Sequence, residues 1–414
     1  MNKHYAWAVL ASCCALMLGF GMTSNVIGQY FVPVTSDLEL GMGQFTLYYA
    51  VRGVFLVGSS TLLNKWLERF DARVLLSGCF AVQLLCIGLM ASFTKVWHWY
   101  VAGAVMGFFL PPVYLVIPPI ILSNWFVKKR GSVIGLAMMF TGLGGMIMNP
   151  VIGAIIQSHG WRFAYIANAI IAGVIVLPFL IFVVRLKPSD KGLKPYGYEE
   201  QAASVGDDAG AGGQSQLKGV SREDAMRSFS FVIMITLFAA CGFFAGYPQL
   251  ITAYGIFVGH PATLASYFLS LCMAGNFLSK LALGFINDKF GGKAMIYSSF
   301  CMTMASLLLL RAGVGSLPLL MAGAFFAGSF LSISSVATPL LIHTIYGSRD
   351  YTRIFVVLSL SQNTLINFGP SIVGYMFDYS GSYMFSFNFG IVVVAAVAVL
   401  AWFSFTTSKK LAWS

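Results

Sequence analysis

The chain has 414 residues, of which 58% are hydrophobic and 9% are charged, with a formal net charge of +11 at pH 7. Soluble globular proteins carry about 25% charged residues, so this composition excludes a water-soluble fold. It also excludes intrinsic disorder, because disordered chains are polar and rich in charge. The seven cysteines lie in apolar stretches without metal-ligand spacing, which predicts small buried side chains and no disulfide framework.

Twelve apolar stretches are long enough to cross a bilayer, for which an α-helix needs about 20 residues. We place them at 7–31, 45–63, 74–92, 98–122, 132–157, 164–185, 228–257, 263–284, 293–311, 317–344, 351–376 and 382–405. The first is too long for a cleavable signal, and Ser24, Asn25 and Gln29 near its end are typical of residues that face a cavity. The pattern predicts an all-α polytopic membrane protein with twelve transmembrane helices.

Basic residues are distributed unevenly over the loops between these spans. Of the 25 Lys and Arg residues, 20 lie on the side that carries both termini and three on the other side, while Arg52 and Lys280 lie within spans. Cytoplasmic loops carry such an excess, so we expect both termini in the cytoplasm and a location in the cell membrane. Anionic lipids of the inner leaflet explain the positive charge without nucleic acid.

Residues 186–227 interrupt the apolar pattern with charged residues and the glycine-rich run 206–213. A polar stretch of this composition is typical of a flexible linker. We therefore divide the chain into an N-terminal six-helix bundle (1–185), a cytoplasmic linker (186–227) and a C-terminal six-helix bundle (228–414).

A local motif occurs in both halves. After the second span the chain reads Glu68-Arg69-Phe70-Asp71-Ala72-Arg73, and after the eighth, at an offset of 220 residues, it reads Asp288-Lys289-Phe290-Gly291-Gly292-Lys293. Repeated halves are a construction rule of secondary transporters. The motif resembles the cytoplasmic loop signature of the major facilitator superfamily, and the second copy is closer to it because Gly284 precedes the acid by four residues. The resemblance implies two six-helix bundles of that fold.

Three further stretches are similar to the oxalate/formate antiporter and monocarboxylate porter group. They are 124–131, the glycine-rich 142–150 followed by Gly160-Trp161-Arg162, and 187–195. Members of that group with carboxylate substrates place a cation in span eight or eleven. Here span eleven has none and span eight has only Lys280, near its end, whose role we leave open together with that of His343.

All fourteen acidic residues lie outside the middle of the predicted spans. This argues against transport of a cation and against a simple proton relay, both of which usually need a membrane carboxylate. Arg52, about 10 Å into span two at 1.5 Å per residue, is the main candidate for binding an anion, since a guanidinium can hold a carboxylate through two hydrogen bonds. The alternatives are that Arg52 extends to the membrane surface or bonds to helix carbonyls.

Uncharged polar residues mark other spans that could line a cavity. We expect substrate binding at Arg52, Asn25, Gln29, Tyr114, Tyr247, Ser335, Gln362 and Asn363. The alternative for each uncharged member is a hydrogen bond between helices, worth about 0.6 kcal/mol on average.

The charged residues of the repeated loops are candidates for gating. They are Glu68, Arg69, Arg73, Asp288, Lys289 and Lys293. Ion pairs formed there while the cytoplasmic side is closed would bias the inward–outward equilibrium. The alternative is ordinary surface charges that set topology.

Together these features predict a secondary active transporter, a symporter or antiporter, that moves a small monocarboxylate-like organic anion across the cytoplasmic membrane by alternating access. We expect no enzymatic activity, cofactor or metal, since no clustered acid and histidine residues occur at membrane depth. We also expect no direct drive by ATP, since the sequence has no phosphate-binding loop of the Gly-x-x-x-x-Gly-Lys-[Ser/Thr] type. The expected partners are the bilayer, the anion and a co-transported or exchanged ion, with the chain as a monomer. An exporter of amphipathic organic compounds and a non-transporting membrane sensor are the alternatives.

Overall fold

The computed structural model describes residues 2–60, 62–126, 130–193, 195–196, 220, 222–347 and 349–407. These residues are almost entirely helical and include no β-strand. Most of the predicted linker, together with Lys128 and Lys129 of the 124–131 motif, lies outside them.

The described helices belong to two compact units. Unit 1 is Met1–Ile27 with Val54–Gly213, and unit 2 is Gly28–Gly53 with Gln214–Ser414, each in its described residues. Unit 2 therefore contains the end of the predicted first span and the first half of the second, in addition to the C-terminal half of the chain.

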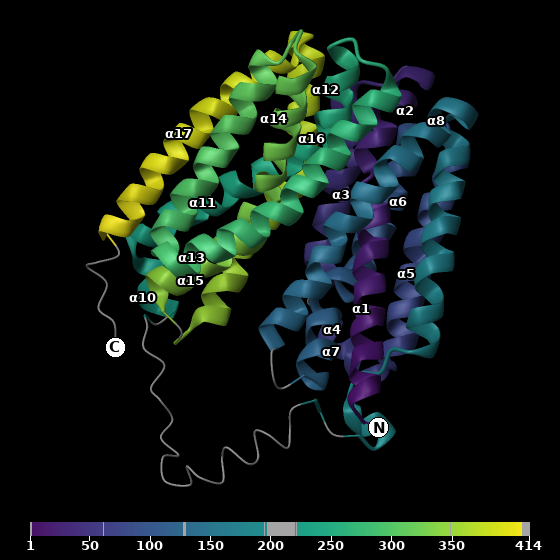
Figure 1. Ribbon diagram of the computed structural model, residues 1–414, viewed down its shortest axis with the longest axis vertical. Helices are drawn as coiled ribbons and strands as arrows, with labels where there is room; N and C mark the ends of the chain where they lie inside the picture. The colour runs from purple at the N-terminus through teal and green to yellow at the C-terminus, as the bar shows by residue number, and fades with distance from the viewer. Residues whose placement is uncertain are drawn as a thin grey trace. The chain divides into compact units, whose positions relative to one another are not determined.

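Unit 1 is built around a long helix that turns back on itself. Its elements are α1 (Asn2–Ser24), the last part of α3 (Met42–Ser60), α4 (Leu63–Arg69), α5 (Ala72–Leu89), η2 (Met90–Ser92), α6 (Val96–Phe108), η3 (Pro112–Val116), α7 (Ile117–Trp125), α8 (Arg130–Phe182) and η4 (Pro188–Lys191). Helices α1 and α5 pack along α8 (Figure 1). The core of this unit consists of aliphatic and aromatic side chains such as Leu76 and Phe80 on α5, Ile117 on α7 and Val176 on α8.

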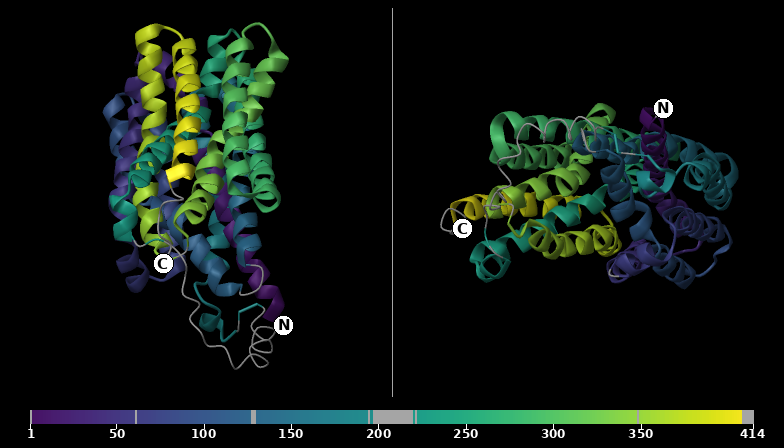
Figure 2. Two further views of the ribbon diagram at one scale, coloured as in Figure 1. Left: turned by 90° about the vertical axis from the view of Figure 1, so that its left-hand side faces the viewer. Right: turned by 90° about the horizontal axis from the view of Figure 1, so that it is seen from below.

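Unit 2 has a similar plan, with a second long reversing helix. Its elements are η1 (Ile27–Tyr30), which begins at the last residue of unit 1, α2 (Phe31–Asp37), the first part of α3 (Met42–Ser60), α10 (Arg222–Arg227), α11 (Phe229–Gly246), η5 (Tyr247–Leu250), α12 (Ile251–Phe257), α13 (Ala262–Ala312), α14 (Leu317–Ser332), η6 (Ile333–Ala337), α15 (Thr338–Tyr346), α16 (Tyr351–Ser380) and α17 (Tyr383–Thr407). Helix α14 packs along α13, and α16 along α11. The long helices of this unit lie alongside one another, with α17 in yellow (Figure 2).

The helices account for twelve membrane spans. Seven stretches of the described chain are long and apolar enough to cross a membrane, and an eighth is the bent pair of α6 with the 112–125 segment. Two of the seven, within α8 and α13, are 51 residues long and break at Gly160 and Gly291, where φ is 80° and 82°, so each makes two spans. Glycine adopts this positive φ without a steric penalty. Helices α3 and α16, of 19 and 30 residues, complete the twelve.

A wider helical turn recurs at the same place in the two halves. The segments η3 and η6 are π-helices, and each is followed by a proline, Pro118 or Pro339, at an offset of 221 residues (118 to 339). Proline has no N–H, so the carbonyl four residues earlier loses its helical partner and the regular ladder cannot continue there. Short π-helices are frequent at functional sites.

Close helix crossings follow the same repeat. A Cβ atom added at Gly21 would collide with the carbonyl oxygen of Thr141, and one added at Gly242 would collide with that of Gln362. In each unit a glycine thus lets two helix backbones meet, as small residues do in membrane proteins generally.

The ends of the predicted linker are attached to the ends of two helices. The Tyr196 N–H donates to the carbonyl of Trp125 at 2.8 Å in unit 1, and the Val220 N–H donates to the carbonyl of Tyr346 at 2.9 Å in unit 2. The Trp125 indole also donates to the carbonyl of Arg185 at 2.9 Å. Each unit therefore holds its own end of the linker.

The cysteines are all free thiols, as expected. Six of them are buried, but Cys301 on α13 is exposed, so the prediction of burial was wrong there. A span surrounded by lipid can present an apolar residue outward, and the sequence pattern did not reveal which side of the helix faces the bundle.

Candidate functional site

Arg52 lies in the middle of α3 and belongs to unit 2. Only 2% of its surface is exposed, and it is the one charged residue that is buried in the described part of the chain. Its guanidinium carbon lies 5.4 Å from the centre of the Tyr49 ring, within the range of a cation–π interaction. Helix α3 therefore places a positive charge inside a membrane span, in contact with an aromatic face.

Helix α16 passes directly beside this position. A Cβ atom added at Gly53 would collide with the side chain of Asn367, so the backbone next to Arg52 touches α16. The Asn367 amide donates to the carbonyl of Asn363 at 2.8 Å, and the Asn363 amide donates to that of Ser359 at the same distance. These amides follow one line of α16, which brings the predicted residue Asn363 within one helical turn of the contact with α3.

Gln362 joins α16 to the π-helix η6. It is 4% exposed, and its amide donates at 3.3 Å both to the carbonyl of Ser334 and to the hydroxyl of Thr338. The Thr338 hydroxyl itself donates to the Ser334 carbonyl at 2.7 Å, and the Ser334 hydroxyl donates to the carbonyl of Cys241 on α11 at 3.1 Å. The π-helix is thus tied to both neighbouring helices by side-chain hydrogen bonds.

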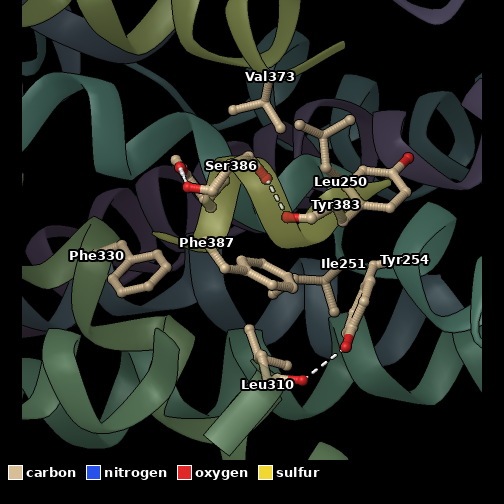
Figure 3. A pocket seen from close by; sticks show the side chains of 10 residues that line it. Leu250, Ile251, Tyr254, Leu310, Phe330, Val373, Tyr383, Ser386 and Phe387 are labelled. Carbon is tan, nitrogen blue, oxygen red and sulfur yellow. Dashed lines mark hydrogen bonds between the residues drawn. The ribbon is translucent and has the colours of Figure 1, made fainter. Parts of the chain in front are cut away.

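Tyr247 lies at the start of η5 beside a small aromatic cavity inside unit 2. Its hydroxyl donates to the carbonyl of Ser386 at 2.8 Å. Tyr254 also lines this cavity, and its hydroxyl donates to the carbonyl of Leu310 at 2.6 Å (Figure 3). The cavity measures about 10 Å³, room for about one water molecule. In this conformation the cavity is too small to hold an organic solute.

Asn25 belongs to unit 1 and Gln29 to unit 2, because the chain divides after Ile27. In unit 2, Gln29 is 3% exposed and its amide lies 3.5 Å from the carbonyl of Ser266. In unit 1, the Asn25 amide donates to the carbonyl of Thr141 at 2.9 Å. Both amides bond to the backbone of another helix.

Tyr114 and Ser335 occupy the two π-helices. The Tyr114 ring in η3 stacks on that of Phe20 with a centroid distance of 4.0 Å. Ser335 in η6 is exposed, and its hydroxyl donates at 3.0 Å to the carbonyl of Leu331 in α14, which precedes η6 directly in the chain. Unit 1 thus holds Tyr114 and Asn25, while unit 2 holds the other six predicted binding residues.

Lys280 on α13 is partly buried and makes no hydrogen bond or ion pair with another described residue. The side chain of His343 lies outside the described residues. None of the acidic residues in the described part of the chain is buried, and no three His, Cys, Asp or Glu side chains there are placed to hold a metal ion.

The predicted gating residues lie at exposed or partly exposed helix ends. Glu68 and Arg69 are exposed at the end of α4, and Arg73 lies 3.6 Å from Asp71, whose carboxylate caps α5 by accepting from the Arg73 N–H at 2.8 Å. Neither Glu68 nor Asp288, the acid of the second loop, forms an ion pair with a described residue.

The second loop has a different local arrangement. Asp288 accepts a hydrogen bond of 3.4 Å from Asn287, and the Lys289 ammonium lies over the rings of Phe285 and Phe290 at 5.7 and 5.4 Å. Lys293, like Asp288 and Lys289, is exposed.

Sequence reasoning missed Asp378, in the last turns of α16. Its two carboxylate oxygens accept hydrogen bonds from the backbone N–H groups of Met42 and Gly43, at 3.0 and 2.8 Å. The available signal was an acid at one span end and a Gly-x-Gly start (Gly41, Gly43) at another. Nothing in the sequence pairs two segments this far apart.

Comparison with known proteins places these features in a family. The chain matches the Major Facilitator Superfamily over residues 9–310 and 258–413. It is 21% identical to a hexuronate transporter of Bacillus subtilis over 384 residues (89% of this chain, 87% of that protein) and 21% identical to monocarboxylate transporter 12 of Rattus norvegicus over 413 residues (92% and 82%). A putative tartrate transporter of Agrobacterium vitis is 28% identical over 171 residues, so this match spans 36% of each chain.

Solved structures agree on the fold. An inward-facing, unoccupied bacterial homologue of the human lysosomal transporter Spinster superposes with a TM-score of 0.70 at 16% identity (99% of this chain, 98% of that one). A D-xylose–proton symporter gives a TM-score of 0.70 at 14% identity (97% of each). The twelve spans, the repeat and these matches together show that the chain is a multi-pass membrane protein of the Major Facilitator Superfamily.

Proposed function

We propose that this protein is a secondary active transporter that moves a small organic anion across the cytoplasmic membrane by alternating access, with Arg52 as its principal anion-binding group. The observation that carries the proposal is the burial of the Arg52 guanidinium at mid-span. Placing arginine at the centre of a span costs about 2.5–3.5 kcal/mol on insertion scales, so such residues are functional candidates by default.

The chemistry of arginine favours a carboxylate partner. The guanidinium stays charged at every physiological pH and presents a planar fork that matches both oxygens of a carboxylate. The amide line of α16 that reaches Asn367 beside Gly53 would supply further hydrogen bonds to a bound organic acid. Lys280 is the secondary candidate, as a partly buried cation without a partner among the described residues.

The relatives support this substrate class. A hexuronate, a monocarboxylate and tartrate are all organic acids, and the names of the three relatives refer to these solutes. We propose a monocarboxylate or related acid for this chain, exchanged or co-transported with an ion. Both termini are placed in the cytoplasm on the strength of the basic loops, and the chain acts as a monomer without cofactor, nucleic acid or enzymatic activity.

The test is a thermal-shift titration of the purified protein with lactate, tartrate, a hexuronate, and neutral and cationic compounds of similar size. We expect stabilisation by at least one organic acid. Arg52→Gln should weaken the apparent affinity for that acid by about 10-fold to 100-fold, the value of losing a hydrogen bond to a charged group, and Arg52→Lys should restore part of it.

Arg311→Gln is the matched control, since it removes one positive charge from an exposed helix end. Uptake of the labelled acid into proteoliposomes completes the test. Stabilisation confined to neutral or cationic compounds would refute the anion proposal. Full transport by Arg52→Gln would remove Arg52 from the site and favour an exporter of amphipathic compounds.

A further inference from the structure

The segment Gly28–Gly53 packs in unit 2, although the chain on both sides of it belongs to unit 1. If unit 2 moves relative to unit 1, this segment must therefore either move with unit 2 or separate from it. For α3, the outcome depends on the contacts that hold this helix against α16.

The strongest of these contacts is made by Asp378. Its Oδ1 accepts from the Met42 N–H at 3.0 Å and its Oδ2 from the Gly43 N–H at 2.8 Å. The first N–H groups of a helix have no partner within the helix. The partial positive charge of the N-terminus adds attraction for a carboxylate. One exposed side chain of α16 thus supplies both a cap and a counter-charge to α3.

The rest of the contact between α3 and α16 consists of close glycine backbones and one long hydrogen bond. A Cβ atom at Gly374 would lie 2.9 Å from the Cα of Gly43, and the Gly43 position also packs on Tyr375. Farther along, the Thr46 hydroxyl reaches the carbonyl of Pro370 only at 3.4 Å. Backbones in contact through glycine can separate and close again without moving large side chains.

We infer that Asp378 is a latch: its carboxylate fixes the N-terminus of α3 to α16 and so positions Arg52 in the shielded state. Release of the latch lets α3 leave α16 and opens the surroundings of Arg52 to solute. The inference rests on the proposed function in one respect, that the chain alternates between two conformations.

The chain offers a matched control for the charge. Glu39 lies between α2 and α3, is exposed, and makes no hydrogen bond or ion pair with a described residue. Glu39→Gln therefore removes one negative charge close to the start of α3 without touching the cap. Asp378→Asn removes the same charge from the cap itself while keeping the size of the side chain.

The readout is the rate at which a maleimide labels a thiol introduced by Thr46→Cys. Thr46 is 0% exposed under α16, so the thiol reacts slowly while the contact is closed. Cys301→Ser removes the exposed native thiol from every variant, and mass spectrometry identifies the labelled site. We expect Asp378→Asn to raise the rate about 2-fold to 30-fold, the range for losing a charge at a helix terminus, and Glu39→Gln to leave it unchanged.

One further variant and one internal control protect the test against misfolding. Asp378→Glu keeps the charge and should label more slowly than Asp378→Asn. A misfolded protein would also label its six buried native cysteines, which a folded but unlatched protein does not. Equal rates for Asp378→Asn and its parent would overturn the latch, as would an equal rise with Glu39→Gln. Labelling needs no substrate, so an absence of anion binding would contradict the proposed function while leaving the labelling result intact.

Discussion

The two π-helices occupy equivalent places in the repeat but are held by different chemistry. In unit 1, η3 contacts α1 through the stacked rings of Tyr114 and Phe20. In unit 2, the residue equivalent to Phe20 is Cys241, whose carbonyl accepts a hydrogen bond from Ser334 of η6. An aromatic stack in one half thus corresponds to a hydrogen bond in the other.

The π-helices also differ in their contact with a second neighbouring helix, which is α16 in unit 2 and α8 in unit 1. Gln362 donates to the Ser334 carbonyl of η6, whereas its equivalent, Thr141, donates only to Met138 in its own helix. A shared proline disrupts the regular ladder in both halves, and the side chains around it have diverged. The comparison teaches that the repeat preserves the backbone break, while each unit stabilises that break in its own way.

The largest effects should come from the feature that the two units share. Gly21→Ala and Gly242→Ala each place a methyl group against a carbonyl oxygen of the neighbouring helix. We expect each to lower stability by about 1–3 kcal/mol, the usual result of overpacking. Melting temperatures by size-exclusion chromatography would measure this, with Gly78→Ala and Gly284→Ala as controls, because a methyl group there meets nothing within 4 Å. Similar losses in all four variants would contradict the close crossings.

A smaller effect should distinguish the units. Gln362→Ala removes one hydrogen bond to Ser334 of η6 and one to Thr338 at the start of α15, and we expect a loss of about 1–2 kcal/mol. Thr141→Ala at the equivalent place breaks no side-chain bond to another helix and should stay within about 0.5 kcal/mol of the parent. Melting curves of both variants in the same detergent provide the comparison. An equal loss at both positions would show that the two breaks are stabilised alike.

The smallest effect should come from the aromatic stack. Phe20→Leu keeps an apolar side chain against η3 but removes the ring pair with Tyr114, worth about 0.5–1.5 kcal/mol. We expect a melting temperature slightly below that of the parent, and Phe20→Tyr should keep the parent value because it keeps the ring. A drop as large as that of Gln362→Ala would mean that η3 depends on its side-chain contacts as strongly as η6.

The fold was largely predictable, because membrane spans depend on local composition and length. The interruption between the predicted spans 132–157 and 164–185 coincides with the break at Gly160, and the repeated loop places Gly291 at the second break. The prolines after η3 and η6 were visible in the sequence, but the π-helical form of the preceding turn was not, since it depends on how neighbouring helices satisfy the freed carbonyls.

The candidate site was predictable only as a set of residues. A polar side chain in a span either bonds to another helix or meets a solute, and the sequence does not separate the two. Gln362, Tyr247 and Asn25 have hydrogen bonds to other helices, and whether they also meet a substrate stays a prediction. Asp378 was out of reach because its partners are more than 300 positions away in the chain.

The attachment of each linker end to its own unit has a practical consequence. Tyr196 is bonded to Trp125 and Val220 to Tyr346, so neither hydrogen bond depends on an unbroken chain between residues 196 and 220. The protein should therefore tolerate being expressed as two polypeptides, cut within the glycine-rich run 206–213. Since the first polypeptide carries residues 28–53, which pack in unit 2, an affinity tag on either fragment should retain both.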